Sequence, residues 1–332
     1  MTDFKSKISN ETRNHKKVLL FTGGGGPSSE ALFRLLSDRY EIHLADADIE
    51  AKPHLIPFSH WHQIPIATSP KFIEEVRKLS QDLQIDLLVP GVDEELVSLA
   101  YSKETFTCDF LLPPLDFIQS HLDKLASNQI LKIRGIDVPK TELPSRRDRV
   151  SFPCVVKPRK GRGSRGFAII HSEKELDAYL LLSRSESDNF IIQELLTGNE
   201  YTVMMLADKK GLLRAVVPVR VFLKKGITIR AETDDNENIV NACRKIHESK
   251  PVPGYYNIQL IESADGSVMP FEINPRISTT ACLALASGVN FIEIYLNNNV
   301  NDGNNISDLA PFQNGLKMKR SWYNEFLGCE LK

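Results

Sequence analysis

Short apolar runs alternate with amphipathic stretches over about the first 110 residues. Residues 17–22 form an apolar run that ends in four consecutive glycines, and the amphipathic stretch after them continues to Asp38. Residues 41–46 form a second apolar run, and the alternation continues as far as Tyr101. Alternating strands and helices predict a small parallel sheet with helices on both faces, whose ligand crevice lies at the carboxyl ends of the strands.

The pattern changes after Pro113-Pro114, which marks a boundary. We expect one helix over residues 116–134. Beyond it, apolar runs with the two-residue alternation of strands predominate, with helices near 173–183 and 235–249 between them. This second region is therefore predicted to be α+β, with long antiparallel hairpins.

Charge and cysteine content exclude several classes of protein. The 41 basic and 43 acidic residues give a net charge of −2, which provides no basic field for a nucleic acid. The N-terminus lacks the apolar core of a signal peptide, and no run of 18 apolar residues is long enough to span a membrane. Scattered cysteines without a CxxC pair are typical of a reducing compartment. We expect a cytoplasmic protein that binds neither nucleic acid nor membrane, with reduced thiols at Cys108, Cys154, Cys243, Cys282 and Cys329.

Two apolar runs near the C-terminal end of the chain flank Asp265-Gly266, which is a strong signal for a two-residue hairpin turn. Such a turn places Gln259 opposite Glu272. It also places Asn257 opposite Asn274. Because residues alternate between the two faces of a strand and directly paired residues share a face, the four side chains are expected on one face of the sheet.

This acid and amide group has oxygen donors of the kind that Mg²⁺ prefers, and Mg²⁺ also accepts phosphate oxygens. Glu262 is expected on the opposite face of the sheet. Arg276, two residues beyond Asn274, is suited to clamp phosphate oxygens. The alternative interpretation is a polar, solvated sheet face with no ligand.

A basic, glycine-rich segment covers residues 157–166, with the sequence KPRKGRGSRG. Lys157 ends a valine-rich run, and three glycines in the segment let backbone amides approach a ligand. This composition fits a cover over a polyphosphate, although the order of a P-loop is absent. The alternative is an ordinary basic hairpin loop.

Together these motifs resemble the ATP-grasp superfamily, in particular the carboxylate–amine ligases similar to the large subunit of carbamoyl phosphate synthetase. The resemblance rests on HLDKLASNQIL, CVVKPRKGRGSRG, FIIQELLTG, GNEYTV, NIQLIE and FEINPR, and it covers about residues 17–325. It implies an ATP-grasp fold preceded by a Rossmann-like pre-ATP-grasp domain. The implied organisation is a flexible tail over residues 1–16, the pre-ATP-grasp α/β domain over 17–115, a small subdomain with the basic glycine loop over 116–190 and a C-terminal subdomain with the metal site over 191–332.

The basic loop and the resemblance imply three groups of site residues. The expected ligands are ATP and Mg²⁺, with two ions and with Mn²⁺ as an alternative metal. Nucleotide contacts are expected from Lys124, Lys157, Arg159, Gly163, Ser164, Glu194, Leu195, Leu196 and Glu200. Metal ligands are expected at Gln259, Glu272 and Asn274, and catalytic cations at Arg276 and Lys157.

The function that the resemblance implies is an ADP-forming carbon–nitrogen ligase. It would activate a small carboxylate as an acyl phosphate and couple it to an amine, and related enzymes are often homodimers. A kinase that releases a phosphorylated small acid is the alternative, and a catalytically silent nucleotide-binding scaffold is a third interpretation. A nicotinamide oxidoreductase is disfavoured because Ser28 or Ser29 stands at the third glycine position of the dinucleotide fingerprint.

Candidates for binding the two substrates are less specific. Arg220 and Lys225, on and after a long strand, are candidates for the acceptor carboxylate, although solvated strand ends have the same composition. Asp93 and Glu94 are candidates for the amine, but Asp93 is equally suited to cap a helix. The glycine turn offers helix-terminus amides to an anionic substrate. The sequence identifies neither the acid nor the amine.

Overall fold

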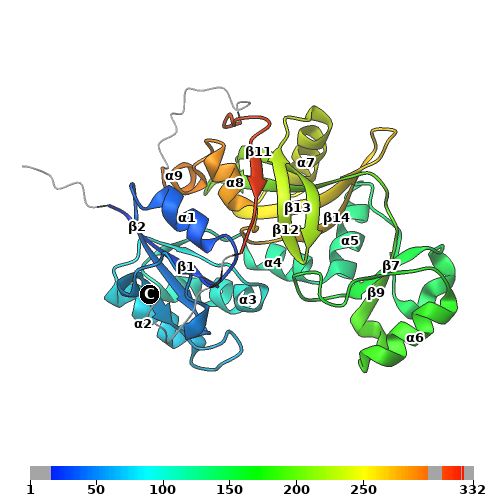
Figure 1. The fold of residues 1–332 in the computed structure, drawn as a ribbon, viewed down its shortest axis with the longest axis horizontal. Coiled ribbons are helices and arrows are strands. Elements are labelled where there is room, and N and C mark those ends of the chain that lie inside the picture. Colours follow the sequence, from blue (N-terminus) through cyan, green and yellow to red (C-terminus); the bar gives the residue numbers. More distant parts are fainter. Residues whose placement is uncertain (1–15, 298–308, 323, 325–332) are drawn as a thin grey trace, which may run out of the picture.

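The computed structural model describes residues 16–297, 309–322 and 324 (Figure 1). Apart from Lys16, the predicted tail over residues 1–16 lies outside the described residues, as does Cys329. Within the described ranges, no helix is both long and apolar enough to cross a membrane.

A five-stranded parallel sheet forms the N-terminal part of the molecule, as the alternation of elements predicts. In spatial order its strands are β3 (Trp61–Gln63), β2 (Glu41–Asp46), β1 (Val18–Thr22), β4 (Leu87–Val89) and β5 (Asp109–Phe110). Its helices are α1 (Ser29–Leu36), α2 (Phe72–Asp82) and α3 (Asp93–Ser102). Leu19 and Phe21 pack with α1, whereas Leu20 packs with α2 and α3, so the helices cover both faces. This arrangement confirms the predicted Rossmann-like part.

The described residues beyond this part contain two antiparallel sheets. The six-stranded sheet has the order β14 (Val268–Asn274), β13 (Gly254–Glu262), β10 (Asn199–Ala207), β11 (Leu213–Lys225), β12 (Ile227–Thr233) and β15 (Lys317–Lys319). The four-stranded sheet has the order β6 (Thr141–Glu142), β9 (Phe190–Glu194), β7 (Cys154–Pro158) and β8 (Ala168–Ile170). These hairpins confirm the expected α+β region.

Six further helices accompany the antiparallel sheets. They are α4 (Leu115–Leu122), α5 (Lys124–Ile133), α6 (Glu173–Ser183), α7 (Glu237–Ser249), α8 (Ala281–Ala286) and α9 (Phe291–Leu296). The single helix predicted over residues 116–134 is wrong, because the chain is extended at Asp123, whose carboxylate accepts the amides of Leu125 and Ala126. Asp123 therefore ends α4 and caps a new helix, α5, which begins at Lys124.

The six-stranded sheet has apolar side chains on both faces. Met204 packs in one cluster with α8, α9 and the α1 face of the parallel sheet. Met205, the next residue, packs in a second cluster with α7 and α5. Because the first cluster spans both parts of the chain, the parallel sheet and the six-stranded sheet are held in a fixed relation by a shared core.

Glu95 joins the carboxyl ends of two parallel strands. Its Oε1 accepts the hydroxyl of Thr22 at the end of β1 (2.7 Å) and the amides of Gly91 (2.9 Å) and Val92 (3.0 Å) after β4. The two strand ends lie so close that a Cβ on Gly91 would come within 2.5 Å of the Thr22 carbonyl oxygen. Burial raises the pKa of Glu95 to about 7, although these three donors oppose the shift.

We predict that Glu95→Gln changes the pH dependence of stability. The Glu95 carboxyl binds its proton more tightly in the folded protein than in the unfolded chain. The contribution of Glu95 to stability is therefore present below about pH 4.5 and is lost as the pH rises through about 7. The free energy of unfolding of the variant, relative to that of the wild type, should therefore rise by roughly 2 kcal/mol from pH 5 to pH 8. Urea unfolding at both pH values measures the difference, and a difference independent of pH would contradict the assignment.

Asp93 connects the parallel-sheet domain to the six-stranded sheet. The helix α3 begins at Asp93 itself and Val92 occupies the capping position, so the expectation that Asp93 caps this helix is wrong. The carboxylate of Asp93 instead accepts from Nε of Arg276, just beyond the end of β14, and the two side chains are 12% and 13% exposed. A shielded ion pair of this kind connects two separately formed sheets at the place where they meet.

Removal of the Asp93 carboxylate should leave the guanidinium of Arg276 partly buried without its acidic partner. We expect Asp93→Asn to lower the free energy of unfolding by about 1–3 kcal/mol. The control is Glu293→Gln, which weakens the Arg39–Glu293 pair between the same two parts of the molecule, where both side chains are about half exposed or more. That exposed pair should contribute less than about 1 kcal/mol. Equal losses in urea unfolding of the two variants would contradict the role of shielding.

Candidate active site

The hairpin between β13 and β14 differs from the predicted two-residue turn. Ser263 donates its amide to the carbonyl of Ser267 (2.9 Å), and Gly266 donates to the carbonyl of Ser263 (3.0 Å). The loop therefore contains the three residues 264–266, with Gly266 in the left-handed region at φ 81°. Continued without interruption, this register would place Gln259 opposite Phe271 and turn Glu272 away from it.

A β-bulge in β14 restores the predicted pairing. Leu260 faces Pro270, whereas the next pair along the hairpin is Gln259 with Glu272, so Phe271 is an extra residue on its strand. Asn257 then faces Asn274, as predicted. The predicted pairs are confirmed, although they follow from a longer loop and a compensating bulge and not from a two-residue turn.

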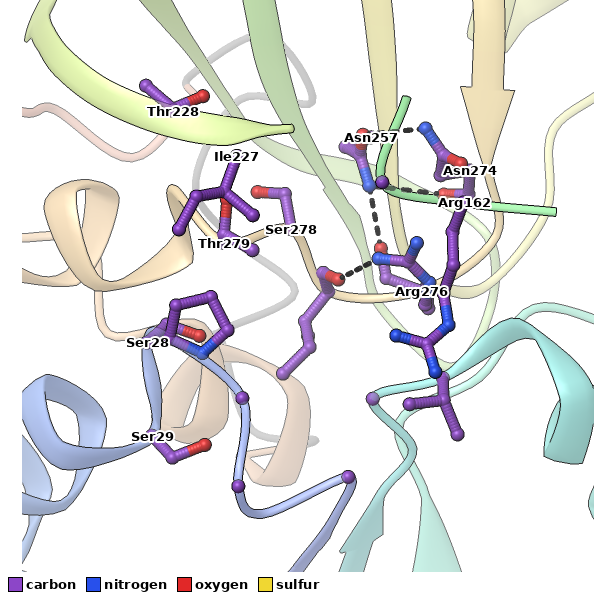
Figure 2. A pocket seen from close by; sticks show the side chains of 18 of the residues that line it. Ser28, Ser29, Arg162, Ile227, Thr228, Asn257, Asn274, Arg276, Ser278 and Thr279 are labelled. Atoms are coloured by element: carbon purple, nitrogen blue, oxygen red, sulfur yellow. Dashed lines mark hydrogen bonds between the residues drawn. The ribbon is translucent and has the colours of Figure 1, made fainter. Parts of the chain in front are cut away.

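The four polar side chains of this hairpin line one cavity of about 450 Å³. Figure 2 shows two of them, Asn257 and Asn274. Asn257 donates to the carbonyl oxygen of Arg276 (2.9 Å) and accepts from Nδ2 of Asn274 (3.3 Å), which orients the amide of Asn274. Glu262 does not line the cavity and accepts from Asn236 at the start of α7. The predicted separation of the two faces is therefore confirmed.

Glu272 is surrounded by three lysines from three different elements. Burial opposes its ionisation, but Lys124 of α5, Lys157 of β7 and Lys224 of β11 together hold its pKa below the usual range. Burial lowers the pKa of Lys157 to about 8, against the attraction of Glu272, and its Nζ lies 5.1 Å from the ring centre of the bulge residue Phe271. The site thus has an ionised carboxylate in a strongly cationic cleft.

Lys224 is a member of the site that the sequence analysis missed. Its Nζ donates to Oε1 of Glu200 (2.6 Å) and to Oε1 of Gln259 (2.9 Å). The adjacent Lys225, which the sequence analysis proposed instead, is exposed and does not line the cavity. Two register shifts in β11 precede Lys224 and decide which of the two lysines faces inward, and the sequence contains no clear signal for them.

The basic loop lies against the same cavity. Lys124 donates to the carbonyl oxygen of Gly161 (2.8 Å), while Arg162 and Gly163 line the cavity. The loop contains Gly161 and Gly163 with positive φ, and Ser164 at φ 55°, so its backbone conformation depends on residues that tolerate the left-handed region. The loop is thus placed where a cover over the site would have to lie.

Glu94 and Arg159 both form ion pairs within the protein. Glu94 accepts a hydrogen bond from Nε of Arg162 (3.1 Å). Burial alone would raise the pKa of Glu94, but the pairing with Arg162 helps to lower this pKa below its usual value. Arg159 donates to both carboxylate oxygens of Asp123, at 2.6 and 3.3 Å. The predicted amine contact of Glu94 and nucleotide contact of Arg159 stay predictions that these pairings do not favour.

The segment after β9 connects the four-stranded sheet to the six-stranded sheet. Glu194 pairs with Lys140 through a backbone bond (2.9 Å) and accepts the Lys140 amide on its carboxylate (3.1 Å). Leu195 and Leu196 are half-buried on the way to β10, where Glu200 meets Lys224. Their predicted roles as nucleotide contacts stay predictions.

Arg220 lies outside the cavity. It donates to Oδ1 of Asn199 (2.8 Å) and stacks on Phe222, with 5.5 Å between the guanidinium carbon and the ring centre. Neither it nor Asp93, which pairs with Arg276, lines the cavity, whereas Arg276 does. The predicted substrate residues are therefore not brought together in the way that the predicted metal ligands Gln259, Glu272 and Asn274 are.

The donors of the hairpin fit a hard divalent cation. Glu272 supplies an ionised carboxylate and Asn274 an oriented amide, which together with phosphate oxygens are typical ligands of Mg²⁺. The amide oxygen of Gln259 accepts from Lys224, so this oxygen already interacts with a positive charge. The cavity therefore has the chemistry to hold a metal bound to a polyphosphate.

Comparisons with known proteins agree with this geometry. Residues 186–322 match the family described as "ATP-grasp in the biosynthetic pathway with Ter operon". The chain is 28% identical over 158 residues to the carbamoyl phosphate synthase large chain of Clostridium perfringens (strain SM101 / Type A), a match that covers 44% of this chain and 15% of that protein.

Solved structures with similar folds cover most of the chain. One is biotin carboxylase from Campylobacter jejuni in its β-γ-ATP complex, with a TM-score of 0.65 and 14% identity over 84% of this chain and 70% of that one. Another is the L-amino acid ligase from Bacillus licheniformis, with a TM-score of 0.62 and 16% identity over 85% of this chain and 73% of that one. The chain has an ATP-grasp fold with an N-terminal Rossmann-like part, its residues 186–322 match an ATP-grasp family, and its sequence resembles that of carbamoyl phosphate synthase large chains.

Proposed function

We propose that this chain is an ADP-forming ligase that uses ATP and Mg²⁺ to activate a carboxylate and couple it to an amine. The observation that carries the proposal is Glu272, an ionised acid that shares one cavity with oriented amides and lies among Lys124, Lys157 and Lys224. A polyphosphate needs cations around its oxygens, and its metal ion needs an anionic ligand, so the two kinds of charge must lie close together. The named relatives support the class of reaction, since they include a synthase, a carboxylase solved with a nucleotide and an amino acid ligase.

The residues on each side of the cleft have complementary roles in this proposal. Glu272 and Asn274, with Gln259 once Lys224 releases it, would hold one or two Mg²⁺ ions or alternatively Mn²⁺. Bound Mg²⁺ supplies positive charge to the phosphate oxygens. Lys124 and Lys157 supply further positive charge, and Lys157 with a pKa of about 8 is largely protonated at neutral pH.

Two displacements complete the proposed reaction. A carboxylate oxygen of the acid attacks the γ-phosphorus, and the bond to the β-phosphate oxygen breaks to release ADP. The amine nitrogen then attacks the acyl carbon, phosphate leaves, and the nitrogen gives up a proton. The loop with Arg162 and Gly163 would exclude water, which would otherwise hydrolyse the acyl phosphate.

We predict that Glu272→Gln weakens the Mg²⁺-dependent binding of ATP by about tenfold or more, because it removes the charged metal ligand. The matched control is Glu262→Gln on the same hairpin, which changes an acid on the opposite face. Calorimetric titration of ATP with and without Mg²⁺ measures the effect. The metal assignment is wrong if both variants bind like the wild type, or if both lose binding equally.

Ligation is distinguished from simple phosphorylation by what ADP release requires. We expect release to depend on an acid and an amine together and the product to contain both, in a screen of small carboxylic and amino acids with and without amines. Mass spectrometry identifies the product. Release with an acid alone, with accumulation of a phosphorylated acid, would replace the ligase by the alternative of a kinase.

A further inference from the structure

The glycine turn after β1 directs the start of α1 into the cavity. Gly23, Gly25, Gly26, Ser28 and Ser29 all line it, on the wall opposite the β13–β14 hairpin (Figure 2). The turn is closely packed, since a Cβ on Gly24 would come within 2.9 Å of the Leu44 side chain. The start of α1 is therefore held firmly, with its positive dipole end toward the cavity.

Two serines at this helix start are buried, and their hydroxyls open into the cavity without a hydrogen-bond partner among the described residues. Ser28 is 8% exposed and Ser29 is 7% exposed, and in the described part of the chain neither hydroxyl has a hydrogen-bond partner. Ser28 occupies the capping position in a helical conformation, with φ −101° and ψ −11°, and makes no capping bond. The hydroxyl of Thr228, a residue 4% exposed on the facing strand β12, also has no hydrogen-bond partner among the described residues. The polar side chains of buried residues normally find hydrogen-bond partners, so three unpartnered hydroxyls that line one cavity point to a ligand.

The backbone of the same helix start also has free donors. In the described part of the chain, the amides of Glu30 and Ala31 donate to no acceptor, whereas the next amide, that of Leu32, donates to the carbonyl of Ser28 (2.9 Å). Hydroxyls and amides that converge at a helix N-terminus form a site for a negatively charged group.

We propose that Ser28, Ser29 and the first-turn amides of α1 bind an anionic group, carboxylate or phosphate, of the substrate other than the nucleotide. The identity of the occupant as a substrate rests on the proposed function. This site shares its cavity with Glu272 and Asn274, so a molecule held here by its anion reaches toward the proposed metal end. The site at the start of α1 takes the role of binding the substrate anion that was predicted for Arg220 and Lys225, both of which lie outside the cavity.

The charges around this site are compatible with an anion. Arg162 and Arg276 line the same cavity and contribute positive potential. Asp46 and Asp48 also line it. The Asp46 carboxylate accepts the amides of Gly25 (2.9 Å) and Asp48 (3.1 Å), and the Asp48 carboxylate accepts the amide of Glu50 (3.0 Å), so backbone dipoles offset part of both charges. The hydroxyls of Ser28 and Ser29 and the free amides thus remain the direct donors.

The test is a titration of the full chain, labelled with ¹⁵N, with sodium phosphate and separately with sodium acetate, against sodium chloride at equal ionic strength. We expect saturable shifts of the Glu30 and Ala31 amide resonances with phosphate, acetate or both. A stronger response to phosphate indicates a phosphorylated substrate, and a stronger response to acetate indicates a carboxylate. Shifts that match those in chloride, or that do not saturate, would overturn the proposal.

The variant for this test is the double substitution Ser28→Ala with Ser29→Ala. It should weaken the anion response at least tenfold but keep α1 intact, because Ser28 makes no capping bond. The control is Ser37→Ala at the other end of the same helix, which should respond like the wild type. An undiminished response in the double variant would also refute the site.

The same titration repeated with Mg²⁺ and ADP separates this inference from the proposed function. Failure of the chain to bind Mg²⁺ and ADP would remove the proposed function, while the anion titration without nucleotide still decides whether the site exists. Selective anion binding that persists with Mg²⁺ and ADP bound supports a site distinct from that of the nucleotide phosphates. Loss of anion binding on addition of the nucleotide would show that the two compete, and would overturn the assignment to a second substrate.

Discussion

The carboxylate of Glu272 is held ionised inside a partly dry cleft, and the arrangement of the candidate site depends on how that charge is balanced. Three lysines from a helix and two strands of different sheets converge on it. Burial of a charge costs free energy unless an opposite charge lies close to it, so the buried Glu272 carboxylate depends on the proximity of these lysines. The same balance of charges prepares the cleft for a polyphosphate with its metal ion.

The bulge at Phe271 is the backbone feature that makes this balance possible. It sets the face on which Glu272 lies, and its own side chain lies near Lys157 of the other sheet. A strand without it would turn the acid away from Gln259. One extra residue therefore determines both the position of the acid and the contact made by a lysine that approaches it.

Ion pairs also link the other walls of the cavity. Asp93 and Glu94, consecutive residues at the start of α3, pair with Arg276 beyond β14 and with Arg162 in the basic loop. Both acids thus connect the parallel-sheet domain to cations that line the cavity. A nucleotide that attracted Arg162 would compete with Glu94, which provides a physical link between binding and the position of the loop.

The sequence by itself determined the alternating α/β part and the antiparallel hairpins, because these depend on local periodicity. It also predicted the grouping of Gln259, Glu272 and Asn274, but from a two-residue turn, whereas the structure reaches it through a three-residue loop and the bulge at Phe271. It did not determine the break at Asp123, the choice of Lys224 over Lys225 or the ion pairs of Asp93 and Glu94. Those features depend on bulges and on contacts between segments far apart in the chain. Neither produces a recognisable pattern in the local sequence. The buried serines at α1 belong to the same class, since only packing of the two domains shows that their hydroxyls face a cavity.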